Sequence, residues 1–254
     1  MNNLLIRTIS GVILALTAVA AVVYLPVWIF KLLIAVLTGI GTWEVFHLLE
    51  KRHRNLFPVL SGIVGFISSL FLLFLSPYLS LFLIFLYSFF VSHREYSIES
   101  LTASVFGLIY PVFFISSLGF LQEENRYLLL VLFATVWAGD TFAYFVGKSF
   151  GRHKFAPKLS PKKTWEGAVG GFLGAVICGV ALSFYLGIKE AVIPVVTAGV
   201  LMQIGDLFES FIKRQVGEKD SSHLIPGHGG VLDRIDALIF ASVVFLIFYQ
   251  IKSI

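Results

Sequence analysis

The sequence predicts an all-α, polytopic integral membrane protein with about nine transmembrane helices and a cytoplasmic N-terminus. Of its 254 residues, 57% are hydrophobic and only 13% are charged, and the mean hydropathy is +0.90. Such a chain has too little polar side-chain surface to cover a water-soluble protein of this size. Its apolar stretches recur at the length needed to cross about 30 Å of hydrocarbon, which takes roughly 20 residues in a helix.

Nine apolar stretches are candidate membrane spans. They cover residues 4–25, 27–49, 56–75, 77–92, 101–121, 127–147, 167–187, 191–212 and 232–250. The first span resembles a secretory signal, because Arg7 precedes its apolar run and small residues occur at Ala18 and Ala20. Its apolar run exceeds the usual length for a signal peptide, so we expect an uncleaved signal anchor.

The distribution of lysine and arginine predicts the orientation of these spans. When successive loops are assigned alternately to two sides, fifteen of the 19 basic residues fall on one side, and that side is expected to be cytoplasmic. The N-terminus then lies inside and the C-terminus outside, in the plasma membrane or inner membrane of the cell. The four basic residues on the other side are Lys31, Arg126, Lys189 and Lys252.

The basic character of the chain indicates anionic lipid and phosphate as partners rather than nucleic acid. The formal net charge is +4, but the basic residues lie in short loops that flank apolar spans. The single cysteine, Cys178, lies inside an apolar span, which excludes a disulfide framework and a thiolate metal cluster. We therefore expect Cys178 to serve only in packing.

The two halves of the chain differ in their content of polar residues. Residues 1–125 are mostly phenylalanine, leucine and isoleucine with short polar turns, which is typical of a transmembrane scaffold. All five aspartates lie in residues 126–254, which we predict to be a catalytic transmembrane region with its active site on the cytoplasmic side. Carboxylates near hydrocarbon cost roughly 2.5–3.5 kcal/mol each at a helix centre, so this concentration indicates a function.

A dense motif lies between the last two predicted spans. It reads SxxKRxxxxKDxxxxxPGHGGxxDRxD and runs from Ser210 to Asp236. This motif resembles the signature of the phosphatidate cytidylyltransferase family, also called CDP-diacylglycerol synthases, with every fixed position filled. The stretch from Ser160 to Gly167, SPKKTWEG, resembles another part of the same family. The resemblance implies an enzyme that transfers CMP from CTP to phosphatidate, giving CDP-diacylglycerol and pyrophosphate.

Four aspartates are expected at one membrane level. Asp140 and Asp206 each lie about seven residues from the cytoplasmic end of their spans, or roughly 10 Å deep. Asp233 and Asp236 open the last span from the same side, on one helix face. Each aspartate by itself could pair with a nearby basic residue or cap a helix. As a group they favour a hard divalent cation, and oxygen ligands without cysteine favour Mg²⁺.

The family resemblance implies roles for individual residues. It assigns Mg²⁺, with K⁺ as a candidate neighbour, to Asp206, Asp233 and Asp236, and we add Asp140 as a fourth candidate ligand. We expect cations to neutralise the triphosphate and the lipid headgroup, and assign them to Lys213, Arg214, Lys219 and Arg234. Lys162 and Lys163 are candidates for binding the nucleotide's phosphates, although both also serve as topology signals. The remaining signature candidates are Ser210 for cofactor binding, and Asp220 and His228 for catalysis.

Two rival functions and several partner choices stay open at this level. An anionic-solute transporter would also carry intramembrane charges, but it predicts charges throughout the midplane. A cytidylyltransferase acting on another lipid phosphate would carry the same signature. Glu44 is expected to pair with Lys51 or Arg94 at least as readily as it serves a site, whereas Glu166 and Glu209 are candidates to support the metal ligands. The oligomeric state is open between monomer and homodimer.

Overall fold

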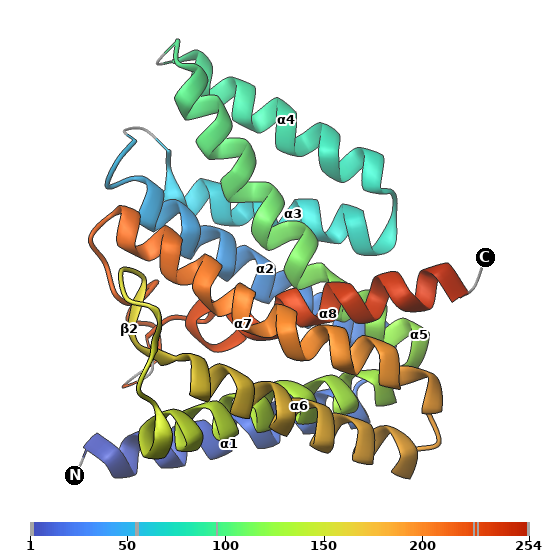
Figure 1. Cartoon of the computed structure of the whole chain (residues 1–254). Coiled ribbons are helices and arrows are strands. Elements are labelled where there is room, and N and C mark those ends of the chain that lie inside the picture. The colour runs from blue at the N-terminus through green and yellow to red at the C-terminus, as the bar shows by residue number, and fades with distance from the viewer. Residues whose placement is uncertain (1–2, 54–55, 95, 226, 228, 253–254) are drawn as a thin grey trace. The chain divides into compact units, whose positions relative to one another are not determined.

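The structure, a computed structural model, describes residues 3–53, 56–94, 96–225, 227 and 229–252. Nearly all of these residues are helical, and the helices are labelled in Figure 1. The chain forms two compact units, one of Met1–Phe120 with Gln215–Arg234 and the other of Leu121–Arg214 with Ile235–Ile254. Within the described residues, five helices are long and apolar enough to cross a membrane, and three further apolar helices are shorter. The prediction of a helical membrane protein is confirmed at this level.

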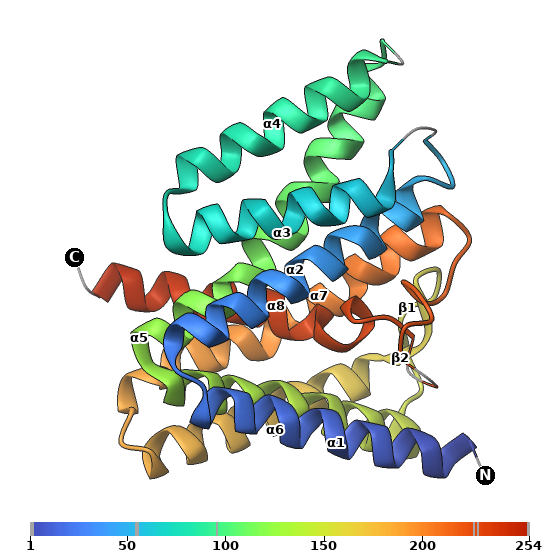
Figure 2. The same ribbon diagram turned by 180° about the vertical axis from the view of Figure 1, so that it is seen from behind.

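The first unit holds the N-terminal helices. They are α1 (Asn3–Tyr24), α2 (Val27–Leu49), α3 (Pro58–Phe74), α4 (Pro77–His93) and the first part of α5 (Ile98–Phe150). Proline at the first position begins both α3 and α4, where its missing N–H costs nothing. Helices α2, α3 and α4 follow one another as antiparallel neighbours, which Figure 2 shows from behind.

Polar pairs link the apolar helices of this unit. The hydroxyls of Ser61 and Tyr87 are 2.7 Å apart and join α3 to α4. Ser69 and Ser116 join α3 to α5 at 2.8 Å, and Ser104 of α5 donates to Ser88 at 3.1 Å. Small hydroxyl side chains let apolar helices approach closely and satisfy one another where water is absent. They give the unit a specific packing that the uniformly apolar surfaces alone would not select.

The second unit contains the later helices and one hairpin. Its elements are the rest of α5, β1 (Lys154–Ala156), β2 (Ser160–Thr164), α6 (Trp165–Tyr185), a 3₁₀ turn η1 (Lys189–Ala191), α7 (Val192–Gln215) and α8 (Leu232–Lys252). The antiparallel strands pair Lys154 with Thr164 and Ala156 with Ser160. The segment between the predicted spans 127–147 and 167–187 therefore contains a short β-hairpin.

Helix α5 unites two of the predicted spans, residues 101–121 and 127–147. Its helical geometry breaks at Asn125, whose φ of −165° and ψ of 114° are extended. The Asn125 side chain accepts a hydrogen bond from the backbone N–H of Tyr127 at 2.9 Å, as an N-cap residue does. The two predicted spans are therefore two helical segments joined at a capped kink.

The glycines of α6 pack this helix against the second segment of α5. A Cβ added at Gly171 would lie 2.9 Å from the Gly139 carbonyl oxygen, and one at Gly167 would lie 2.9 Å from the Ala143 oxygen. Only glycine permits helix backbones to approach this closely. The GxxxG spacing of Gly167 and Gly171, which favours close packing of helices, therefore marks a packing face, and this contact forms one wall of a cavity.

Candidate active site

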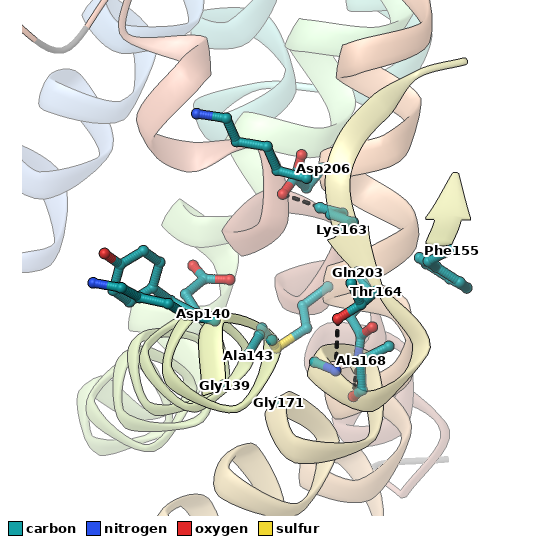
Figure 3. A pocket seen from close by; sticks show the side chains of 16 residues that line it. Gly139, Asp140, Ala143, Phe155, Lys163, Thr164, Ala168, Gly171, Gln203 and Asp206 are labelled. Carbon is teal, nitrogen blue, oxygen red and sulfur yellow. Dashed lines mark hydrogen bonds and ion pairs between the residues drawn. The ribbon is translucent and has the colours of Figure 1, made fainter. Parts of the chain in front are cut away.

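The second unit contains a cavity of about 450 Å³ between α5, α6, α7 and the hairpin. Its polar lining includes Asp140, Lys148, Lys162, Lys163, Gln203 and Asp206, and Figure 3 shows the side chains around it. Glycines and alanines of the α5–α6 contact form the opposite, apolar part of the wall. A cavity of this size with few polar groups on an apolar wall has the character of a small-molecule site. Four residues predicted for the site, two lysines and two aspartates, line it together.

The hairpin places its two consecutive lysines at this cavity. Strand β2 ends at Thr164, whose hydroxyl accepts a hydrogen bond from the Gly167 backbone N–H at 3.1 Å and so caps α6. Lys163, just before this cap, forms an ion pair with Asp206 of α7, with 2.6 Å between Nζ and Oδ2. Both side chains remain partly exposed, at 26% and 35%. The pair therefore orients a lysine and a carboxylate at the wall while leaving both accessible to a ligand.

Helices α7 and α8 bring two further carboxylates and a second lysine close to Asp206. Glu209 is almost fully buried and lies 3.2 Å from the Nζ of Lys213, one helical turn later. The Asp236 carboxylate of α8 interacts with Asp206, Glu209 and Lys213. A Cβ at Gly205 would lie 2.6 Å from the Asp236 carbonyl oxygen, so α7 and α8 are in close contact here. Three carboxylates thus share their surroundings with two lysines.

This group of oxygens fits a hard divalent cation in part. Within the described part of the chain, no set of three or more His, Cys, Asp or Glu side chains is arranged to hold a metal ion. Mg²⁺, however, is commonly bound through one or two carboxylates, with water and substrate phosphates completing its shell. Asp206 and Asp236 interact as like charges, which a divalent ion would offset. The donor chemistry of this pair therefore suits Mg²⁺ together with a phosphate ligand.

The first unit holds most of the signature loop, and Asp233 organises it. The Oδ2 atom of Asp233 accepts hydrogen bonds from the backbone N–H of Ser221 at 2.7 Å, from its hydroxyl at 2.8 Å and from the Gly230 N–H at 2.7 Å. Gly229, at a φ of +83°, turns the chain directly beside this carboxylate. One oxygen of Asp233 thus folds the loop, and its role as a metal ligand stays a prediction.

Glu44 of α2 holds the same loop, and sequence reasoning missed this role. Its Oε1 accepts hydrogen bonds from the Ser222 hydroxyl at 2.6 Å and the Val231 N–H at 2.8 Å, and its Oε2 accepts from the Leu232 N–H at 2.8 Å. These N–H groups lie at the N-terminus of α8, where a negative charge is favoured. Gly230 packs directly on Glu44 and Ser221, which leaves no space for a side chain.

The expected pairing of Glu44 with Lys51 or Arg94 is wrong. Lys51 forms an ion pair with Glu218, and the Arg94 guanidinium lies over the Phe57 ring at 5.3 Å. Both basic residues lie at helix ends, where partners close to the surface are available. A fully buried carboxylate instead needs several donors at once, and backbone N–H groups at a helix start supply them. The one sequence signal for this role was an isolated acidic residue within an apolar span.

The other candidate residues occupy several settings. Ser210 is buried, and its hydroxyl is 3.4 Å from Asp206 Oδ1. The Arg214 Nε donates to the Leu159 carbonyl oxygen in the hairpin turn at 3.3 Å. Lys219 and Arg234 are exposed, and Asp220 is half-buried beside Gly229. His228 lies outside the described residues.

Two further residues, Gln203 and Thr164, line the cavity, whereas Glu166 is not part of its lining. The Gln203 side-chain amide donates to the Ala168 carbonyl oxygen at 2.9 Å and so ties α7 to the start of α6. Thr164, the cap of α6, also lines the cavity. Sequence reasoning missed it, and the available signal was a threonine just before an apolar span, where helix N-caps occur. Glu166, expected to support the metal ligands, instead accepts from the backbone N–H groups of Arg152 and His153 at the hairpin base.

Comparison with known proteins identifies the family of this chain. A model of the Cytidylyltransferase family matches residues 5–252. The chain is 37% identical to the phosphatidate cytidylyltransferase of Aquifex aeolicus (strain VF5) over 249 residues, which are 95% of this chain and 90% of that protein. It is 45% identical to the phosphatidate cytidylyltransferase of Haemophilus influenzae over 134 residues, 50% of this chain and 46% of that protein. The chain belongs to the cytidylyltransferase family.

Proposed function

We propose that this protein is a phosphatidate cytidylyltransferase that transfers CMP from CTP to phosphatidate, producing CDP-diacylglycerol and pyrophosphate for phospholipid synthesis. The observation that carries the proposal is the similarity, along nearly the whole chain, to a protein named for this activity. The cavity with its lysines and carboxylates supports the same chemistry. The proposal includes nine membrane spans, a cytoplasmic N-terminus and an active site that faces the cytoplasm, supported by the distribution of basic residues.

The reaction joins two anions. An oxygen of the phosphatidate phosphate attacks the α-phosphorus of CTP, and the bond from that phosphorus to the oxygen bridging to the β-phosphate breaks. Pyrophosphate leaves with the bonding electron pair. The attacking phosphate is ionised at neutral pH, so no general base is required. Positioning and electrostatic stabilisation are therefore expected to account for most of the rate enhancement.

The residues of the cavity suit these two tasks. Lys162 and Lys163 present positive charge at the rim, where they would bind the phosphates of the nucleotide. Asp206 keeps Lys163 oriented, and Glu209 keeps Lys213 oriented. We assign Mg²⁺ to Asp206 and Asp236, with Asp140 on the wall of the same cavity as Asp206. When bound, the ion would polarise the phosphoryl oxygens and offset the charge on the departing pyrophosphate.

The test uses purified full-length protein with CTP labelled at the α-phosphate, phosphatidate and Mg²⁺. Label should appear in a lipid product with stoichiometric release of unlabelled pyrophosphate, and EDTA should abolish both. Asp206→Asn and Asp236→Asn should each lower kcat by about 10²-fold or more, as for the loss of an electrostatic stabiliser. Glu190→Gln, which removes a carboxylate that pairs with Lys252 at 3.2 Å, is the matched control.

Two results would contradict the proposal. Labelling of a polyprenyl phosphate but not of phosphatidate would move the acceptor to another lipid class. Uptake of an anionic solute into liposomes, without any labelled lipid, would favour a transporter. Near-normal turnover in both aspartate variants would remove the metal assignment while leaving the activity itself intact.

A further inference from the structure

The first unit contains a second cavity, lined by residues of α3 and α4 and of their ends and remote in sequence from the signature. We call it the α3–α4 groove. Its volume is about 680 Å³, within the roughly 300–1,000 Å³ typical of small-molecule pockets. Its lining includes Phe57, Leu60, Leu83, Leu86, Phe90 and Arg94. Every lining residue except Arg94 is apolar or aromatic, so the groove has one charged end.

The length of the groove matches one leaflet of a bilayer. Along α4 its lining runs from Leu83 to Arg94, eleven residues apart, or about 16 Å at 1.5 Å per residue. Half of a hydrocarbon core of about 30 Å is roughly 15 Å. The side chains of Leu60 and Leu86 are about half exposed, at 49% and 50%, so the groove opens sideways rather than being sealed by protein. An acyl chain of one leaflet fits both its length and its access.

The charged end of the groove lies where α4 ends, close in sequence to an exposed aromatic residue. Arg94 ends α4, and Tyr96, two residues later, is 92% exposed, as is usual for interfacial aromatic residues. The Arg94 guanidinium lies over the rings of Phe57 and Phe90 at 5.3 and 6.0 Å. A cation over an aromatic ring is attracted by the ring face and uses none of its N–H hydrogen bonds in that contact, and a guanidinium carries five N–H donors. A guanidinium can bind a phosphate with two parallel hydrogen bonds.

The backbone around Arg94 is held in an uncommon conformation. Phe57 and Tyr96 are the two non-glycine residues with positive φ in the described part of the chain, at 47° and 51°. An aromatic residue in the left-handed region costs of order 1–3 kcal/mol, and such strain is concentrated at functional sites. Phe57 lies directly under Arg94 and also lines the groove. One of the two uncommon conformations therefore lies in the groove lining, and the other lies two residues after Arg94.

We propose that the α3–α4 groove binds an anionic glycerophospholipid, with one acyl chain along α4 and the headgroup phosphate on Arg94. The ligand class follows from the combination of an apolar channel one leaflet long with a single cation at its headgroup end. This lipid need not be a substrate, because none of the lining residues belongs to the signature or to the cavity of the second unit. The groove would give the N-terminal half a binding function of its own.

Native mass spectrometry of the purified, delipidated full-length protein tests the proposal. The chain is titrated with phosphatidylglycerol and, separately, with phosphatidylcholine of the same acyl chains. Phosphatidylglycerol is the probe because it carries the anionic phosphate without being a phosphatidate. Wild type should bind its first phosphatidylglycerol molecule more tightly than its first phosphatidylcholine molecule. Arg94→Gln should weaken the affinity for phosphatidylglycerol by about tenfold, the loss expected for a charged hydrogen bond. Arg94→Lys should retain part of the preference.

Two further variants separate the groove from general charge attraction. Arg52→Gln removes one positive charge from an exposed loop of the same unit and should leave binding unchanged. Leu86→Trp fills the groove at a half-exposed position and should weaken both lipids. Unchanged phosphatidylglycerol binding in Arg94→Gln and Leu86→Trp would overturn the proposal. An equal loss in Arg52→Gln and Arg94→Gln would also overturn it, because the attraction would then be non-specific.

Discussion

Replacing Glu44 tests whether a residue outside the signature positions the signature loop. Glu44→Ala removes the acceptor for three hydrogen bonds, from Ser222, Val231 and Leu232. A hydrogen bond to a charged group contributes about 1.5–3 kcal/mol, so an additive total would be about 4.5–9 kcal/mol. The three donors share one carboxylate and do not add independently, and we expect a loss of about 3–5 kcal/mol in the free energy of unfolding.

Thermal unfolding of the purified full-length protein measures this loss. At roughly 2–4 °C per kcal/mol for a chain of this size, the expected decrease in Tm is about 6–20 °C. Glu44→Gln keeps one carbonyl oxygen as an acceptor and should show a smaller decrease. Glu50→Ala, at an exposed carboxylate on the end of the same helix, is the matched control and should leave the Tm unchanged.

Hydrogen exchange distinguishes a positioning role from general destabilisation. In Glu44→Gln, measured well below its Tm, the amides of residues 219–225 and 229–232 should exchange faster than in wild type while those of α3 and α4 stay protected. The value of kcat should fall more than KM changes, because the loop would be displaced without losing its own side chains. A Tm, a kcat and an exchange pattern equal to those of Glu50→Ala would refute the reasoning.

Three shorter predictions concern other contacts. Lys163→Gln should raise KM for CTP by about tenfold because a charged hydrogen bond to phosphate is lost. Lys158→Gln, in the exposed hairpin turn, should leave KM for CTP unchanged. Equal changes in KM in the two variants, measured in steady-state assays, would contradict the role of Lys163. A hydrogen bond and ion pair with Lys51 hold the pKa of Glu218 below its usual value, so this pair stabilises the fold at neutral pH and stops doing so as the pH falls through that lowered pKa. The Tm difference between wild type and Lys51→Met should therefore shrink at acidic pH. A Tm difference that does not change with pH would refute this prediction. Gly205→Ala should lower the Tm through a clash with α8 worth about 1–3 kcal/mol, and an unchanged Tm would show that the two helices separate easily.

The sequence was informative wherever the physical signal is local. Apolar runs located the helices, and the break at Asn125 falls between two predicted spans, because hydropathy and capping depend on neighbouring residues. The glycine spacing at Gly167 and Gly171 predicted close packing for the same reason. The sequence motifs indicated a set of candidate site residues but not which of them lie together. The tertiary structure shows that four of the candidates line one cavity: Asp140, Lys162, Lys163 and Asp206.

Partners that lie far apart along the chain were decided by the tertiary structure alone. Glu44 and Ser222 are 178 positions apart, and no sequence period connects them. Charge alone made Lys51 and Arg94 plausible partners for Glu44, but burial selects backbone donors at a helix start instead. Amino-acid order thus determined which segments form apolar helices and which residue types are candidates for the chemistry. Packing decided which of those residues meet, because ion pairs and buried hydrogen bonds depend on distances that only the folded chain defines.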